Sequence, residues 1–311
     1  MMEDVGKNLK QILQKRNYFQ EYQQMVKQIN ENPDVQRFLN QHQAELTQAD
    51  IEKSYSQLYE YIQQKEKFLA NDPTMIAPGY EPKLQISHHV IEVTYSPTPE
   101  LLKRKQLQQV NERIKTFYLP KMLREASLAS FEITDGRSQA IQQAAHFIQQ
   151  YEQKQSTFVK GLYLVGNFGV GKTYLLGAIA KKLAEDGYDS TLIHFPTFAV
   201  EMKQAIGKDT MIQLLNEIKT APILMIDDIG ADAMSSWIRD DVLGVILQYR
   251  MQEMLPTFFS SNFTMKELER HLTVTQKGDQ EPIKAMRIME RIAYLSQEIM
   301  MIGQNRRNPK M

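Results

Sequence analysis

A single stretch, residues 161–173, constrains the fold of this chain more than any other. It begins with a short apolar strand pattern, Gly161–Val165. The eight residues after it are Gly166, Asn167, Phe168, Gly169, Val170, Gly171, Lys172 and Thr173. They complete the G-x-x-x-x-G-K-[ST] pattern of a phosphate-binding loop, and a helical pattern follows from Leu175 to Leu183. The order of strand, glycine loop and helix predicts a P-loop nucleotide site on a parallel sheet, in an α/β fold.

Each part of this loop has a task in binding ATP. The glycines let backbone N–H groups turn toward a phosphate, and the start of the helix adds partial positive charge. We expect Lys172 to bridge the terminal phosphates and the hydroxyl of Thr173 to ligate Mg2+. A glycine-rich turn can match such a pattern by chance, but here the strand and the helix are both in register with it.

A second apolar strand pattern, Pro222–Asp228, ends in two acids. Buried strands rarely end in paired carboxylates unless a cation or a polarised water lies there. We expect Asp227 to hold Mg2+, directly or through water, and Asp228 to accept a proton from the attacking water. An ordinary acidic turn is the alternative.

A third strand pattern, Thr257–Asn262, ends in polar residues. We expect Asn262 at its tip to orient the water or to sense the γ-phosphate, whereas a simple turn residue is the alternative. Thr264 and Glu267 then form a capping-box pattern that marks the start of the next helix. Strands and helices alternate from residue 138 onward, which indicates a parallel sheet flanked by crossover helices.

The chain before this region has a different character. Residues 1 to about 70 are rich in glutamine and carry apolar stripes at helical spacing, with a helix start at Asn32. The stripes are expected to form a small core, although one of them could instead dock a partner. A strand is expected at His89–Tyr95. The predicted organisation is a mostly helical N-terminal domain over 1–98, a connector helix and linker over 99–135, and the P-loop domain over 136–311.

Composition narrows the possible classes of protein. The 311 residues include no cysteine, which excludes disulfides, thiolate metal sites and thiol catalysis. Basic and acidic residues number 37 each, so bulk electrostatics does not favour a chain that coats nucleic acid. No apolar run approaches the roughly 20 residues that span a bilayer, and the N-terminus lacks a secretory signal pattern. We expect a cytoplasmic protein with no membrane partner.

The spacing of the phosphate-binding loop, the strand that ends in two acids and the strand that ends in Asn262 resembles that of AAA+ ATPases. The phosphate-binding loop, Ile226–Gly230 and Ser260–Phe263 are closer still to the bacterial replicative helicase loader family, which Ser235–Asp240 and Arg287–Ile292 also resemble. The resemblance covers residues 120–308 well and the N-terminal third in outline. It implies an ATP-dependent factor that delivers the hexameric replicative DNA helicase onto DNA and holds it through the N-terminal domain. It also implies transient contact with single-stranded DNA, other primosome proteins as partners, and self-assembly in the ATP state.

Two absences accompany the resemblance. Loaders of this family often carry a cysteine-based zinc site in the N-terminal domain, but Tyr61–Tyr95 contains no cysteine. His88 and His89 would point to opposite faces of a strand, so we predict no zinc. A helical lid usually follows an AAA+ core, yet only Gly303–Met311 follows the expected last strand, Glu298–Ile302. We therefore expect an AAA+ core without a C-terminal lid.

Arg287 and Arg291 are four residues apart on an expected helix and therefore share one face. In the loader resemblance, Arg291 falls at the position of the finger that completes the ATP site of a neighbouring subunit. The alternative is that both arginines are solvated and pair with Glu281 or Glu290.

Three residues are candidates for contact with single-stranded DNA: Lys203, Trp237 and Arg239. One aromatic ring and two cations could stack a base and hold phosphate. Because Trp237 is the only tryptophan, a place in the core is the alternative.

Other functions fit parts of the sequence. A lidless AAA+ transposition-helper ATPase would share the core, although a conspicuously basic surface would favour it more. A small-molecule P-loop kinase would have no use for a separate helical domain. An adaptor that binds nucleotide but barely hydrolyses it would use the same loop, and the sequence leaves that alternative open.

Overall fold

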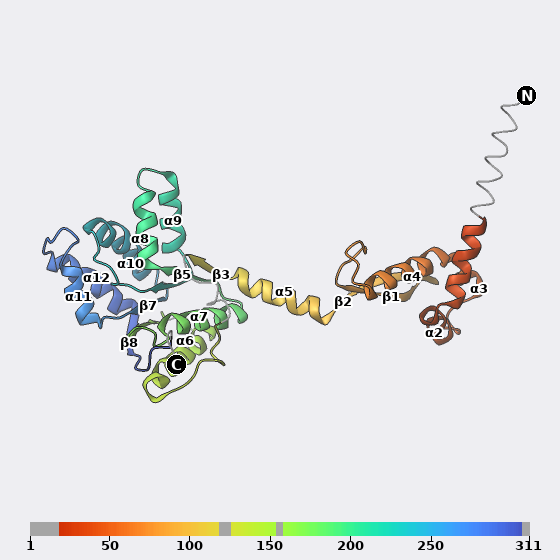
Figure 1. The fold of residues 1–311 in the computed structure, drawn as a ribbon, viewed down its shortest axis with the longest axis horizontal. Coiled ribbons are helices and arrows are strands. Elements are labelled where there is room, and N and C mark those ends of the chain that lie inside the picture. The colour runs from red at the N-terminus through yellow and green to blue at the C-terminus, as the bar shows by residue number, and fades with distance from the viewer. Residues whose placement is uncertain (1–18, 118–125, 154–157, 307–311) are drawn as a thin grey trace, which may run out of the picture. The chain divides into compact units, whose positions relative to one another are not determined.

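The computed structural model describes residues 19–117, 126–153 and 158–306, which form two compact units divided between Gln106 and Leu107. Each unit is described by itself below (Figure 1). The helical pattern expected within residues 1–18 lies outside the described residues. None of the helices in the described ranges is long and apolar enough to cross a membrane.

The first unit combines helices with one β-hairpin. A helix covers residues 19–31 and is followed by α2 (Pro33–Gln41), α3 (Gln48–Lys53), α4 (Tyr55–Leu69), β1 (Tyr80–Ser87) and β2 (Val90–Pro97). The predicted helix start is confirmed, because Asn32 Oδ1 accepts from the backbone N–H of both Asp34 and Val35 at 3.1 Å. The predicted small core is confirmed too: Ile29, Val35, Leu58, Ile62 and Ile91 are buried together.

The hairpin corrects two expectations. Only one strand was expected, at His89–Tyr95, but a second strand, β1, pairs with it although Pro82 lies within β1. His88 and His89 form the turn between them, with φ of 47° and 61°. Positive φ at both central residues is typical of a type I′ two-residue hairpin turn, so neither histidine lies on a strand. The opposite-face argument about them was wrong, and the expectation of no zinc stays a prediction.

The second unit contains a six-stranded parallel sheet in the order β3-β5-β6-β7-β4-β8. Its strands are β3 (Ile114–Phe117), β4 (Gly161–Val165), β5 (Ser190–His194), β6 (Ile223–Asp227), β7 (Thr257–Ser261) and β8 (Ser296–Met300). The α/β prediction with a parallel sheet is therefore confirmed, and β4, β6 and β7 are the three strands from which it was made.

The helices form layers on the two faces of this sheet. They are α6 (Asp135–Glu152), α7 (Lys172–Glu185), α8 (Phe195–Gln204), α9 (Asp209–Lys219), the π-helical segment η2 (Ile238–Leu243), α10 (Gly244–Gln252), α11 (Met265–Thr273) and α12 (Pro282–Leu295). Side chains alternate along each strand, so β4 feeds both layers. Leu162 and Leu164 pack with α6 and α7, whereas Tyr163 and Val165 pack with the other layer, which includes α8 and α10 (Figure 1).

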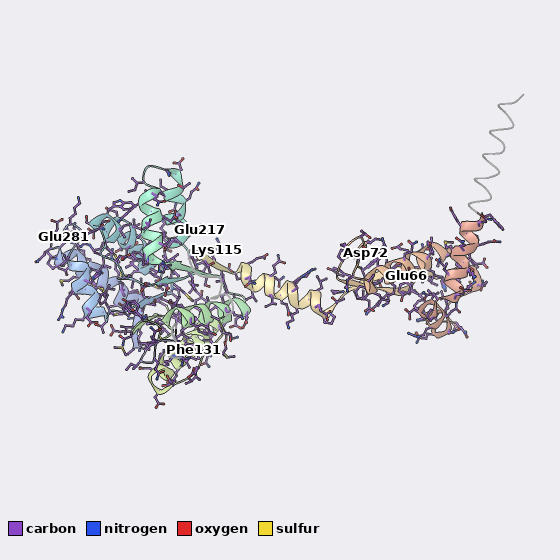
Figure 2. The ribbon with its side chains drawn as sticks, in the orientation of Figure 1. Glu66, Asp72, Lys115, Phe131, Glu217 and Glu281 are labelled. Atoms are coloured by element: carbon purple, nitrogen blue, oxygen red, sulfur yellow. The ribbon has the colours of Figure 1, made fainter. Side chains whose placement is uncertain are left out.

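The segments at the start and at the end of the second unit can be compared with the predicted domain limits. Helix α5 (Pro99–Glu112) lies in the range expected for a connector helix, but β3 in the same range pairs with β5 in the sheet. Lys115 of this strand also forms an exposed ion pair of 3.0 Å with Glu217 of α9 (Figure 2). After β8, residues 301–306 form no helix. The division at 98 and 135 stays a prediction.

Candidate nucleotide site at the ends of the central strands

The phosphate-binding loop joins β4 to α7 and depends on its glycines. Gly169 and Gly171 have φ of 76° and 101°, a conformation that residues with a Cβ atom rarely adopt. A Cβ atom on Gly166 would lie 2.2 Å from the carbonyl oxygen of Met301. The loop therefore needs glycine for its backbone turn and for its close contact with the segment that follows β8.

Lys172 connects the loop to the tip of β7. Its side chain is 7% exposed, and Nζ donates to the carbonyl oxygens of Gly166 at 2.6 Å and Asn167 at 3.0 Å. Nζ also donates to Asn262 Oδ1 at 2.7 Å. Because β4 and β7 are neighbours in the sheet, these residues meet although they are 90 positions apart. The structure thus brings together the lysine and the asparagine that the sequence singled out separately.

Asp227 lies at the end of β6 and faces the start of α7. Thr173 Oγ1 donates to Asp227 Oδ1 at 2.8 Å and to Oδ2 at 3.1 Å. Ser260 of β7 donates to the same carboxylate and accepts from the backbone N–H of Asp228 at 3.0 Å. Burial raises the pKa of Asp227, while the hydrogen bonds from Ser260 and Thr173 act in the opposite direction.

The donor set at this point fits Mg2+. A threonine hydroxyl and a carboxylate with 5% exposure are hard oxygen ligands, and they already lie within hydrogen-bond distance of each other. A phosphate-loop hydroxyl and a strand-end aspartate are the pair that holds this ion in P-loop proteins. Thr173 and Asp227 are therefore the residues that would hold Mg2+ beside bound ATP.

Asp228 has a different environment from its neighbour. Its φ is 62°, and its side chain is 32% exposed, so it turns away from the strand toward solvent. His194 at the end of β5 lies with Nε2 3.9 Å from Asp228 Oδ2, and its Nδ1 lies 2.8 Å from Thr197 Oγ1. A carboxylate that water can reach is suited to accept a proton.

Sequence reasoning missed two residues of this site. Ser260 was named only as part of the polar end of β7 and was given no role of its own, because its hydroxyl meets Asp227 only when β6 and β7 pair in the sheet. His194 was missed because the preceding apolar run extended to Phe195, and only the parallel pairing of His194 with Asp227 brings it to the acids.

Arg291 lies apart from the phosphate-binding loop, on α12. Its Nη1 donates to the carbonyl oxygen of Gly244 at 2.8 Å, at the junction of η2 and α10. Burial and the neighbouring Arg287 lower the pKa of Arg291. Both arginines line a cavity of about 450 Å3, together with Trp237. Among the described residues no ion pair joins either arginine to Glu281 or Glu290, and Glu281 pairs with Arg239 and Lys284 instead.

The three DNA candidates do not form one site. Arg239 is 1% exposed and donates to Asp240 at 2.7 and 2.9 Å, to the Leu272 carbonyl oxygen at 2.9 Å, and to Glu281. Its interpretation as a DNA contact was wrong, because the guanidinium is buried and bound by protein acceptors. Trp237 is half-buried against the core, and Lys203 is exposed on α8.

Comparisons with known proteins agree with this geometry. A family model described as primosomal protein DnaI N-terminus matches residues 2–95, and the bacterial DnaA ATPase domain model matches residues 127–294. The replicative helicase loader DnaI of Bacillus subtilis is 39% identical over 313 residues, which covers 99% of this chain and 100% of that protein.

Two solved structures are similar to a large part of the chain. The crystal structure of DnaI has a TM-score of 0.56 at 46% identity and covers 61% of this chain and 98% of that one. A putative primosome component from Streptococcus pyogenes has a TM-score of 0.53 at 41% identity. The match covers 64% of this chain and 97% of that one. Given identity along nearly the whole length and an AAA+ core of the ATP-binding class, the chain belongs to the DnaI family of bacterial replicative helicase loaders.

Proposed function

We propose that this protein is an ATP-hydrolysing loader that delivers the hexameric replicative helicase onto DNA. The observation that carries the proposal is the meeting of Lys172, Thr173, Asp227 and Asn262 at one edge of the sheet, in a chain that aligns with a loader along its length. The first unit, which matches the N-terminal model of the family, is proposed to hold the helicase.

The residues of the site divide the work of hydrolysis. Backbone N–H groups of the loop and Nζ of Lys172 bind and orient the triphosphate. Mg2+, held by Thr173 and Asp227, supplies positive charge to the phosphates when it is bound. Asp228 accepts the proton of the attacking water, and His194 next to it helps to position that carboxylate. Asn262, which accepts from Lys172 Nζ, is proposed to orient the attacking water or to sense the terminal phosphate.

Assembly is the second part of the proposal. Copies of the chain are proposed to associate in the ATP state, with Arg291 completing the site of a neighbouring copy. Transient contact with single-stranded DNA is proposed to involve Lys203 and Trp237, without Arg239. Other primosome proteins are proposed as further partners.

A binding and loading experiment tests the proposed function. The full chain, immobilised through a C-terminal tag, is expected to retain the purified replicative helicase hexamer of its own species, whereas residues 99–311 alone are not. With ATP, the full chain is expected to increase the amount of helicase on single-stranded circular DNA, measured by co-sedimentation. Failure to bind the helicase under any nucleotide condition would contradict the loader function.

A further inference from the structure

The residue directly after Asn262 has both of its backbone polar groups bound by side chains. Phe263 N donates to Ser261 Oγ at 3.1 Å, and the Phe263 carbonyl oxygen accepts from Tyr163 OH at 2.8 Å. Asn262 itself accepts from Lys172 Nζ at 2.7 Å through Oδ1. The turn that carries this asparagine is therefore fixed by hydrogen bonds from two further side chains.

Tyr163 reaches the turn from β4, the strand that leads into the phosphate-binding loop. Its backbone pairs with Phe259 of β7, and Figure 1 shows the two strands within one sheet. The side chain is fully buried. Burial raises the pKa of Tyr163, while the nearby Ser261 acts in the opposite direction with a smaller effect. The phenol therefore keeps its proton at neutral pH and remains a hydrogen-bond donor to the turn.

Ser261 also connects this turn to the chain that follows β6. Its fully buried Oγ donates to the carbonyl oxygen of Ile229 at 2.7 Å. Ile229 is the residue after Asp228, and its N–H donates to the Ser260 carbonyl oxygen at 2.9 Å. One hydroxyl thus contacts both the turn that carries Asn262 and the turn that carries Asp228.

Such hydrogen bonds matter most where a strand has ended. Beyond its last ladder bond, the backbone of a strand is held only by turns, side chains or water. A polar group that acts on a reacting phosphate must be held to within about 0.5 Å, and a misplacement of about 1 Å can lower the rate about a hundredfold. A single neutral hydrogen bond contributes little to the stability of a whole domain. Losing one should therefore loosen the turn and leave the fold intact.

We propose that Tyr163 and Ser261 are positioning residues that hold Asn262 in place for its task at the terminal phosphate of ATP. The inference rests on the proposed ATP hydrolysis and adds two residues to it. Neither side chain touches the nucleotide, because both are fully buried. Each acts through the backbone of Phe263 instead.

Variants that remove one hydroxyl each test the proposal. Tyr163→Phe keeps the ring, and Ser261→Ala removes a single oxygen atom. For the full chain with Mg2+, each variant is expected to bind ATP within about twofold of the unaltered protein and to lower kcat about five- to twentyfold. Fluorescent-nucleotide titration and phosphate release measure the two quantities. Unchanged kcat in both variants would overturn the proposal.

Combination with Asn262→Ala tests whether Tyr163 acts through the asparagine. Residues that act as a unit have non-additive effects, so Tyr163→Phe should lower the rate by less than about twofold once Asn262 is already replaced. Single-turnover hydrolysis at high protein concentration keeps the slow rates measurable. The same fold-loss with and without Asn262 would show that Tyr163 does not act through it and would overturn the proposal.

Thr257→Val is the matched control, because Thr257 lies at the opposite end of the same strand. Its fully buried hydroxyl likewise donates to a backbone carbonyl oxygen, that of Leu255 at 3.0 Å, and accepts an N–H, from Arg250 Nε at 2.8 Å. This variant is expected to lower the melting temperature at least as much as Ser261→Ala and to keep kcat within about twofold. An equal loss of kcat in Thr257→Val would assign the effect to general destabilisation. If the unaltered protein hydrolyses no ATP, the proposed hydrolysis itself fails.

Discussion

At the scale of single residues, one serine hydroxyl contributes to the different environments of two adjacent acids. Ser260 donates to the buried carboxylate of Asp227 and accepts from the backbone N–H of Asp228. The hydroxyl orients the first acid toward Thr173 and holds the chain where it turns into the left-handed conformation of Asp228. One acid is therefore buried among donors, as a metal ligand should be, and the next is open to water.

The division of roles between Lys172 and Asp228 can be measured. Lys172→Ala is expected to abolish ATP binding, because backbone amides alone leave the triphosphate charge poorly compensated. Asp228→Asn is expected to bind ATP normally and to lower kcat by about 10²-fold or more, since the amide keeps the shape but accepts no proton. Fluorescent-nucleotide titration and phosphate release measure the two effects. Equal loss of ATP binding in both variants would contradict the assignment.

At the scale of elements, an ion-pair network joins η2 to the start of α12. Arg239 of η2 binds Asp240 beside it and Glu281, the residue before α12, which Figure 2 labels. Lys284 on the first turn of α12 contacts both carboxylates, at 3.2 Å and 2.6 Å. Arg239 also donates to the Leu272 carbonyl oxygen near the end of α11. The network therefore positions the helix that carries Arg291.

Removing Arg239 is expected to destabilise the second unit in a pH-dependent way. Arg239→Met should lower the free energy of unfolding by about 2 to 4 kcal/mol at pH 7. This loss is smaller than that expected on breaking a fully buried ion pair, because water reaches the carboxylates of Asp240 and Glu281. The pKa of Asp240 is lowered. Burial by itself would raise this pKa, but the hydrogen bonds and positive charges of Arg239 and Lys284 have the larger effect. The ionised Asp240 thus stabilises the fold above its ordinary pKa near 4, and this contribution disappears at lower pH.

Urea denaturation at pH 7 and at pH 3.5 measures this effect. The difference in unfolding free energy between the unaltered protein and Arg239→Met should shrink at the lower pH. Arg270→Met, which removes an exposed arginine from α11, is the control and should change stability by less than about 0.5 kcal/mol. A pH-independent difference would contradict an electrostatic role for Arg239.

At the scale of the whole molecule, the surface around Arg291 bears on assembly. The cavity that it lines with Arg287 and Trp237 opens between η2 and α12. On α12, Ile283 and Met286 are 66% and 57% exposed. The cavity is lined by Lys284, Arg287 and Arg291 together with Asp240 and Asp241. Its arginines and the exposed apolar side chains of α12 suit contact with a second copy that brings the charge of a bound nucleotide.

Mixing two inactive variants tests whether Arg291 acts on a neighbouring copy. Arg291→Ala is expected to bind ATP normally and to lose the assembly-dependent part of hydrolysis, which can be worth about 10³-fold. Lys172→Ala keeps an intact Arg291 but lacks a working site. Mixed assemblies should therefore regain part of the activity, measured as phosphate release with assembly checked by sedimentation. No recovery in confirmed mixed assemblies would contradict action between copies.

The nucleotide core could be predicted from the sequence because its signals are local. A glycine loop needs glycine at the positions where the backbone turns, so Gly169 and Gly171 identify it without knowledge of the fold. Apolar strands that end in Asp227 and Asn262 predict where polar groups gather, since parallel strands end at one edge of the sheet. Asn32 and Thr264 capped their helices as predicted, because a cap depends on residues two or three positions away.

The rest depended on residues far apart in the sequence. Arg239 resembled a free surface cation, and only the approach of α11 and α12 showed that its guanidinium is buried. β1 contains a proline, and its pairing with β2 decided its conformation. By itself the sequence determined the phosphate-binding loop, the parallel sheet and the family. Only the tertiary structure decided which cations are buried and which hydroxyls hold the turn after β7, because the burial and hydrogen bonding of Arg239 and Tyr163 arise from segments that meet only in the folded chain.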